Sequence, residues 1–180
     1  MNAQQYRAVI GWFNARPAAK KVLRAVSIGV VAAVYLLYLS LLAWLAWHAM
    51  WAQLGVTAVV PAAAFVVGTA LRAAIDRPRP YTKYGFVPLF PKNKIGQSMP
   101  SRHCFSAAAI AAAVWYVLPP LGAVLAVLAV VIAVSRVITG VHFVSDVLAG
   151  LAFGLVFAVA GRVAYIAAAS ALGYYAIMIL

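Results

Sequence analysis

The chain has 180 residues, of which 67% are hydrophobic and 9% are charged, whereas about a quarter of the residues in an ordinary soluble domain are charged. This composition excludes an ordinary soluble protein and indicates an integral membrane protein, built as one compact helical bundle over residues 1–180. Lys and Arg number 14 against 2 Asp and Glu, which gives a formal net charge of +12. Because the positive charges are concentrated in two short segments, we expect anionic membrane lipid as the partner and no nucleic acid.

The N-terminal segment, residues 1–24, mixes aromatic and basic side chains. Such a pattern is typical of an amphipathic helix that lies in the headgroup region, so we expect an interfacial anchor there. The first span is predicted over 25–50, with a group of tryptophans near its end as interfacial aromatics. These tryptophans are Trp44, Trp47 and Trp51.

Further apolar stretches predict four more spans, which makes an all-α polytopic bundle of about five spans plus the N-terminal helix. Polar residues 76–99 separate the second span from the third, and a loop of this length in a compact protein is usually functional or disordered. Pro119 and Pro120 form a tight turn between the third and fourth spans. The predicted spans are 54–75, 101–118, 121–138 and a stretch from near His142 towards Ser170 and the C-terminus.

The few polar residues of the bundle cluster at the ends of predicted spans. In a bundle of five antiparallel spans, the ends of the second and fourth spans and the starts of the third and fifth lie at the same membrane face. We therefore expect the four clusters to form one pocket. They are Arg72, Asp76, Arg77 and Arg79; Ser101, Arg102 and His103; Ser135 and Arg136; and His142 and Asp146.

Three arginines in these clusters have few acidic partners. A charge within a span costs roughly 2.5–3.5 kcal/mol on insertion scales, so such residues are normally paired, functional or snorkelling. Arg72, Arg79 and Arg136 offer planar forks that suit phosphate, and we predict that a substrate phosphate supplies the missing negative charge. The alternative, independent snorkelling of each side chain, weighs more for four others: Arg77, Lys83, Lys92 and Lys94.

Two histidines and a carboxylate give the predicted pocket a catalytic pattern. His142 and Asp146 are four residues apart, so on a helix they share a face, and the carboxylate can orient the imidazole as a nucleophile. His103 opens the opposing helix, where it can protonate a leaving group, and the free N–H groups of that helix start, with Ser101, favour an anion. The alternatives are a structural His–Asp pair and a merely interfacial His103.

Other hydrolytic chemistries fit the sequence poorly. Two acids, three histidines and one cysteine cannot supply a two-metal site, and we expect no cofactor. Ser101 stands beside Arg102 without an evident base, which disfavours a serine triad. We expect Cys104 to be a packing residue and Asp76 to pair with a neighbouring arginine.

Three motifs occur in a fixed order: Arg72-x6-Arg79-Pro80, Pro100-Ser101-Arg102-His103, and Ser135-Arg136-x5-His142-x3-Asp146. Over residues 72–146, this order resembles the type-2 phosphatidic-acid phosphatase superfamily, which includes lipid phosphatases and vanadium haloperoxidases. Its usual patterns are Lys-x6-Arg-Pro, Pro-Ser-Gly-His and Ser-Arg-x5-His-x3-Asp, so arginine replaces lysine at 72 and glycine at 102.

The resemblance implies a metal-independent membrane enzyme that cleaves phosphate from undecaprenyl diphosphate, phosphatidylglycerophosphate or phosphatidate through a phosphohistidine. It implies His142 as nucleophile, Asp146 as its orienting carboxylate and His103 as general acid. Arg102 either points towards a second phosphate or headgroup, or the loop has a variant shape. The implied phosphate ligands are Arg72, Arg79, Ser101 and Arg136, with Arg102 added as a fifth candidate.

The resemblance also implies a site on the extracytoplasmic side of the plasma membrane, and we keep that expectation. The positive-inside rule opposes it, because five Lys and Arg precede the first span and seven lie between Arg72 and Arg102, on the same face. Two other classes of function stay open. A non-catalytic lipid-binding protein or small transporter would explain the spans and the basic residues, and a vanadate-binding oxidase would share the pocket, although those enzymes are soluble.

Overall fold

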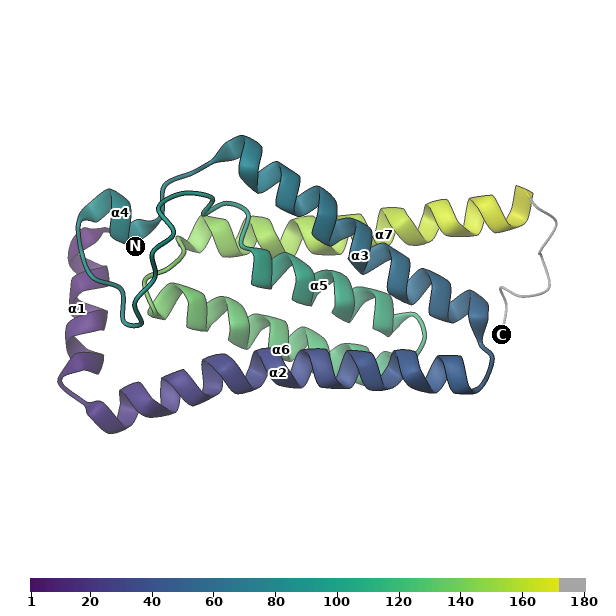
Figure 1. Cartoon of the computed structure of the whole chain (residues 1–180), viewed down its shortest axis with the longest axis horizontal. Helices are drawn as coiled ribbons and strands as arrows, with labels where there is room; N and C mark the ends of the chain where they lie inside the picture. The colour runs from purple at the N-terminus through teal and green to yellow at the C-terminus, as the bar shows by residue number, and fades with distance from the viewer. Residues whose placement is uncertain (172–180) are drawn as a thin grey trace.

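The computed structural model describes residues 1–171, and every regular element within them is a helix (Figure 1). The predicted all-α bundle is confirmed. The helices are α1 (Ala3–Asn14), α2 (Pro17–Trp47), α3 (Trp51–Ile75), α4 (Pro80–Tyr84), α5 (Arg102–Trp115), α6 (Pro119–Ile138) and α7 (Val144–Ala171).

Within residues 1–171, four helices are long and apolar enough to cross a membrane: α2, α3, α6 and α7. The predicted third span is α5, which has only 14 residues and is therefore about 21 Å long, short of a hydrocarbon core of about 30 Å. Nine of its residues are buried. It contacts α2, α3, α6 and α7, and Figure 1 shows it between them. The bundle is thus four long helices around a short interior one.

The N-terminal boundary differs from the sequence prediction. Helix α2 begins at Pro17, so residues 17–24 belong to the first long helix and not to the interfacial one. A proline at the first helical position costs no hydrogen bond and favours this start. Helix α1 lies across the end of the bundle at which α2 begins (Figure 1). The turn predicted at Pro119 and Pro120 lies just before them, at 116–118, and the two prolines are the first residues of α6. The continuation of the fifth stretch beyond Ala171 lies outside the described residues.

Two glycines set the close contact between α5 and α7. A Cβ atom added at Gly154 would lie 2.3 Å from the carbonyl oxygen of Phe105, and one at Gly150 would lie 2.8 Å from that of Ser101. Small residues four apart let helix backbones approach closely in membranes. The approach brings the starts of the two helices together, and the backbone N–H of Ser101 donates to the carbonyl of Asp146 at 2.9 Å.

The polar segment after α3 folds back over the same end of the bundle. Backbone hydrogen bonds hold it in place, from Ser98 N to Arg77 O at 2.9 Å and from Leu89 N to Thr139 O at 3.1 Å. The expected polar loop over 76–99 is therefore an ordered cap, with α4 inside it. It lies where α3 and α6 end and where α5 and α7 begin.

Candidate active site

A cavity of about 190 Å³ lies under this cap, and we call it the cationic cavity. Six of its nine lining residues carry a positive charge and none of the nine is acidic. Each of the four predicted clusters contributes at least one lining residue, whereas five members of these clusters do not line the cavity: Asp76, Arg77, Ser101, Ser135 and Asp146. The lining residues are Arg72, Arg79, Lys92, Lys94, Arg102, His103, Arg136, Val141 and His142.

Arg72 and Arg79 are buried and anchored by backbone carbonyls. Arg72, in the last turn of α3, donates from Nη1 to Pro100 O at 3.0 Å and from Nη2 to Gln97 O. Arg79 donates from Nε to Gly96 O at 3.1 Å and from Nη1 to Val141 O at 3.3 Å. Within residues 1–171 neither arginine pairs with a carboxylate. Their positions are therefore fixed while their charge stays available to an anion.

Arg102 and Arg136 approach the cavity from two other helices. Arg136 lies in the last turn of α6 and donates from Nη2 to the carbonyl of Ser27 in α2 at 3.3 Å. Arg102 opens α5, and its guanidinium lies 5.6 Å from the ring centre of Phe65. Arg102, which replaces the glycine of the usual pattern, thus adds a further cation to the cavity wall.

His142 is buried beside Asp146, although not on the helix face that the spacing predicted. Helix α7 begins at Val144, so His142 lies in the preceding turn. Its Nδ1 lies 3.5 Å from Asp146 Oδ2 and 3.3 Å from Ser98 Oγ. Asp146 also accepts a hydrogen bond from Phe143 N at 2.8 Å, as an acidic residue in the first turn of a helix often does. This contact holds the carboxylate against the turn that carries His142.

The environment of His142 favours a neutral imidazole. Burial lowers the pKa of His142, nearby arginines lower it further, and Asp146 opposes both effects. Because Ser98 and Asp146 contact Nδ1, Nε2 is the ring nitrogen left to face the cavity. A neutral imidazole with a free Nε2 is the form that can act as a nucleophile.

Asp146 is fully buried, and two of its partners were not predicted from the sequence. Arg77 Nη1 lies 2.7 Å from Asp146 Oδ1, and the Ser98 hydroxyl donates to Oδ2. Arg77 also lies over the ring of Phe143, 4.6 Å from its centre. The expected pairing of Asp76 with an arginine is wrong. Its carboxylate accepts from Gln97 N at 3.0 Å and makes no ion pair in the described part of the chain.

Helix α1 reaches the site through Tyr6, which is fully buried. Its hydroxyl donates to the carbonyl of His142 at 3.0 Å, and its ring stacks on Phe86 at 5.5 Å between centres. Burial, and secondarily the charge of Asp146, raise the pKa of Tyr6 to about 12, so the phenol stays a donor. The N-terminal helix therefore packs against the turn that carries His142.

Of the second motif, His103 lines the cavity and Ser101 lies behind its wall. His103, in the first turn of α5, lines the cavity and is exposed to it. Ser101 is fully buried and is not among the lining residues, so it lies behind the wall next to α7. Cys104 is fully buried in the hydrophobic core, as predicted.

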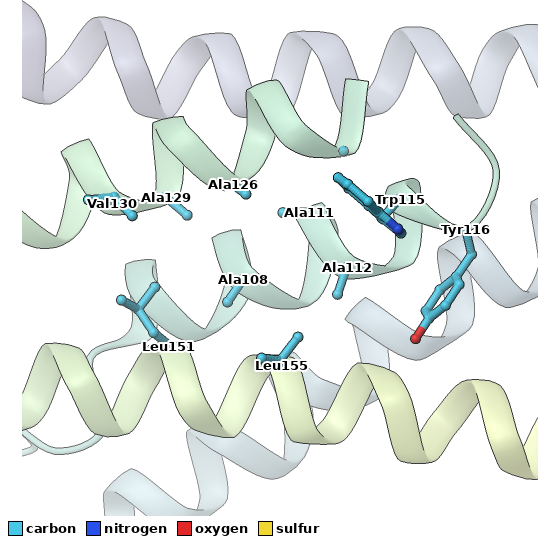
Figure 2. Close-up of a pocket in the computed structure, with 11 residues that line it drawn as sticks. Ala108, Ala111, Ala112, Trp115, Tyr116, Ala126, Ala129, Val130, Leu151 and Leu155 are labelled. Carbon is cyan, nitrogen blue, oxygen red and sulfur yellow. The ribbon is translucent and has the colours of Figure 1, made fainter. Parts of the chain in front are cut away.

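A second cavity, of about 410 Å³, lies among the middle and far parts of α5, α6 and α7, and we call it the apolar cavity (Figure 2). Among residues 1–171, its wall carries no charged residue and shares no residue with the cationic cavity. Alanines dominate it, and Trp115 and Tyr116 lie at the end of α5 away from His103. The lining residues are Ala108, Ala111, Ala112, Trp115, Tyr116, Gly122, Ala126, Ala129, Val130, Leu151 and Leu155.

Comparison with known proteins decides the family. The model of the PAP2 superfamily matches residues 52–170. The chain belongs to the PAP2 superfamily. The PAP2 match includes all three motifs and ends before the described part of α7 does. It begins within α3, so α1 and α2 lie outside it.

Individual relatives of this PAP2 protein share parts of the sequence or the fold. Lipid A 1-phosphatase of Rhizobium etli is 32% identical over 105 residues, 56% of this chain, and that of Rhizobium johnstonii is 34% identical over 94 residues, 49% of this chain. These matches span only 45% and 38% of the two relatives.

Two crystal structures share the fold. The Bacillus subtilis PAP2-type phosphatidylglycerolphosphate phosphatase has a TM-score of 0.64 at 24% identity, covering 90% of this chain and 86% of its own. Aquifex aeolicus LpxE has a TM-score of 0.68 at 22% identity, covering 89% and 94%.

Proposed function

We propose that this PAP2 protein is a phosphatase that removes a phosphate from a membrane lipid phosphate or diphosphate through a phosphohistidine on His142. The observation that carries the proposal is the cationic cavity, in which a buried histidine faces six positive side chains and contacts a buried carboxylate. A charged cavity without acidic lining residues favours an anion, and the long apolar helices favour a substrate that resides in the bilayer.

In the first step, Nε2 of His142 attacks phosphorus, the P–N bond forms and the bond to the leaving oxygen breaks. His103 donates a proton to that oxygen, so the lipid leaves as an alcohol or as a monophosphate. Asp146 stabilises the positive charge that develops on the imidazole. The arginines of the cavity stabilise the equatorial oxygens of the transferring phosphoryl group, which is where most of the catalysis of such reactions arises.

In the second step, water attacks the phosphohistidine. His103, now neutral, accepts a proton from the water, the P–N bond breaks and inorganic phosphate leaves. Ser101 is too deep in the wall to line the cavity, so its proposed contribution is to hold the start of α5 against Asp146. The free backbone N–H groups of that helix start remain candidates for a phosphate oxygen.

We propose that the reaction needs no metal. The donor set supports this, because arginine and lysine line the cavity where a metal site would need carboxylates, histidines or thiolates. Within residues 1–171, no three His, Cys, Asp or Glu side chains gather closely enough to hold an ion.

We further propose a plasma-membrane location with the cavity on the extracytoplasmic side, in keeping with the motif resemblance. The basic residues near the cavity argue for the opposite side, so labelling must decide. A cysteine placed at the exposed Lys83 should react with a membrane-impermeant maleimide in intact cells if the cavity is extracytoplasmic, because Cys104 is buried and stays silent. Labelling only after lysis would place the cavity in the cytoplasm.

The function is tested by measuring phosphate release in detergent with EDTA, for the wild type and for His142→Ala. Four lipids cover the candidates: undecaprenyl diphosphate, phosphatidylglycerophosphate, phosphatidate and, because of the Rhizobium relatives, lipid A. Release that survives EDTA and disappears in a folded His142→Ala variant is expected. Release that persists in the variant would refute the nucleophile. No release from any lipid would favour a non-catalytic lipid-binding protein or transporter.

A further inference from the structure

A third cavity, of about 420 Å³, adjoins the cationic cavity on the side of α2, and we call it the side cavity. The two cavities share Lys92, His103 and Arg136 as lining residues, so these side chains stand on the boundary between them. The remaining walls of the side cavity come from α2 and from the cap. They are Arg24, Ser27, Ile28, Val31, Phe90 and Pro91.

The α2 wall follows one face of that helix, because its four lining residues are spaced by three, one and three positions. The face is polar where α2 starts and apolar further along, from Arg24 and Ser27 to Ile28 and Val31. A lipid suits this order of side chains, with its anionic group next to Arg24 and its hydrocarbon beside Val31. Arg24 is steadied by the cap, since its guanidinium lies 5.9 Å from the ring centre of Phe90.

Ser27 supplies an independent sign of a ligand. The residue is only 7% exposed, and its hydroxyl has no hydrogen-bond partner among residues 1–171. Nε of Arg136, on the boundary between the cavities, is likewise buried and unpartnered in that part of the chain. Burying a polar group without a partner is unfavourable, so polar atoms of this kind usually meet a ligand or water.

The position of His103 indicates which part of the substrate would occupy the side cavity. His142 lines only the cationic cavity, whereas His103 lines both. If His103 protonates the leaving oxygen, the leaving group extends past His103 into the side cavity. Two of the cations that line the side cavity are Arg24 and Lys92. A leaving group without a negative charge would give these two cations no counter-charge.

We infer that the side cavity is a subsite for a second, non-scissile phosphate of the substrate, bound by Arg24, Lys92 and Ser27. The preferred substrate class is therefore a lipid that carries another phosphate a few bonds from the scissile one, such as a lipid diphosphate. This inference rests on the proposed function. On cleavage of a diphosphate, the phosphorus–bridging oxygen bond breaks, His103 protonates the bridging oxygen, and the lipid monophosphate is left in the side cavity.

The test compares farnesyl diphosphate with farnesyl monophosphate in phospholipid-free detergent. The wild type should show the higher kcat/KM with the diphosphate. Arg24→Gln should lower the ratio of the two kcat/KM values about tenfold, the usual size of one lost charge-assisted hydrogen bond. Lys21→Gln is the matched control, because Lys21 is one turn away on α2 and outside the cavity, and it should keep the wild-type ratio.

A second variant separates binding from folding. Ser27→Ala should lower the same ratio about threefold without lowering the melting temperature, because the hydroxyl has no protein partner in the described residues to lose. A lower melting temperature with an unchanged ratio would make Ser27 structural and would count against the subsite.

Binding of farnesyl diphosphate to the His142→Ala variant tests the inference even if the protein does not hydrolyse these lipids. Calorimetry with this background should show farnesyl diphosphate binding about tenfold more weakly after Arg24→Gln. Unchanged diphosphate binding or an unchanged kcat/KM ratio would overturn the inference, whichever way the phosphatase assay ends. Stimulation of monophosphate cleavage by added phosphatidylglycerol, lost in Arg24→Gln, would also overturn it, because the site would then bind a separate lipid headgroup.

Discussion

The cationic and apolar cavities share two helices, α5 and α6, yet they have opposite chemistry. The first is at the helix ends and is lined by arginine, lysine and histidine, and the second is further along the helices and is lined by alanine, leucine and aromatic residues (Figure 2). Charges are least costly at the ends of membrane helices, where caps and water can reach them. Only the outermost turns of this bundle are therefore available for phosphate chemistry, and the middle of the bundle is occupied by packed side chains and hydrocarbon.

The largest expected effect comes from removing the carboxylate behind the cationic cavity. Asp146→Asn should lower kcat about 10³-fold, because His142 loses the charge that stabilises its imidazolium and Arg77 loses its partner. Steady-state kinetics on the preferred lipid measures it. Asp76→Asn is the control, and its kcat should stay within about threefold of the wild type. Among residues 1–171, Asp76 accepts one backbone hydrogen bond and makes no ion pair. Equal losses in both variants would contradict the role of Asp146.

A smaller loss is expected from Arg77→Gln. Arg77 does not line the cationic cavity and acts through Asp146, so kcat should fall about tenfold to a hundredfold while KM changes little. Lys83→Gln is a close control, because Lys83 also contacts the ring of Phe143 but does not pair with Asp146. A rise in KM with an unchanged kcat would contradict this role and would make Arg77 a substrate ligand.

The pH dependence should reveal the buried, neutral state of His142. A histidine is ordinarily half-protonated near pH 6.5, and burial lowers the pKa of His142 below that value. The neutral nucleophile therefore persists as the pH falls, and the acidic limb of kcat/KM, corrected for substrate ionisation, should lie below the ordinary histidine value near pH 6.5. An acidic limb at or above pH 6.5 would mean that Asp146 raises the pKa of His142 by at least as much as burial lowers it.

The smallest effect is expected in the apolar cavity. Ala126 lines it from α6, and Ala126→Leu adds carbon atoms without touching a charged group. Filling an apolar space should leave kcat within about twofold and keep or raise the melting temperature. A tenfold loss of activity would show that the apolar cavity holds part of the substrate and would weaken the contrast between the two regions.

Much of the cationic cavity could be predicted from the sequence, because antiparallel spans place alternate helix ends on one face. Five residues at these helix ends were predicted to lie together, and the structure brings all five to one cavity: Arg72, Arg79, His103, Arg136 and His142. The prediction needed only the positions of polar residues relative to apolar runs, which is the strongest signal in a membrane sequence.

The contacts that hold the residues of the cavity in place could not be predicted from the sequence. Arg77 and Ser98 reach Asp146 from the irregular segment, where no hydrophobic periodicity fixes the direction of a side chain. Tyr6 belongs to an amphipathic helix whose apolar face suits the lipid interface as well as the protein, and the structure packs it against His142. Ser101 was expected in the cavity, and the close approach of α5 to Gly150 of α7 places it behind the wall.

Transfer of phosphate to His142 can be tested by trapping the phosphohistidine intermediate. The enzyme is mixed with a lipid that carries a radiolabelled scissile phosphate, quenched with base within milliseconds, and digested for peptide mapping. We expect a base-stable, acid-labile label on the peptide that contains His142, absent from His142→Ala and formed no more slowly than phosphate is released. Phosphate release without that label, or with the label on another residue, would contradict transfer to His142.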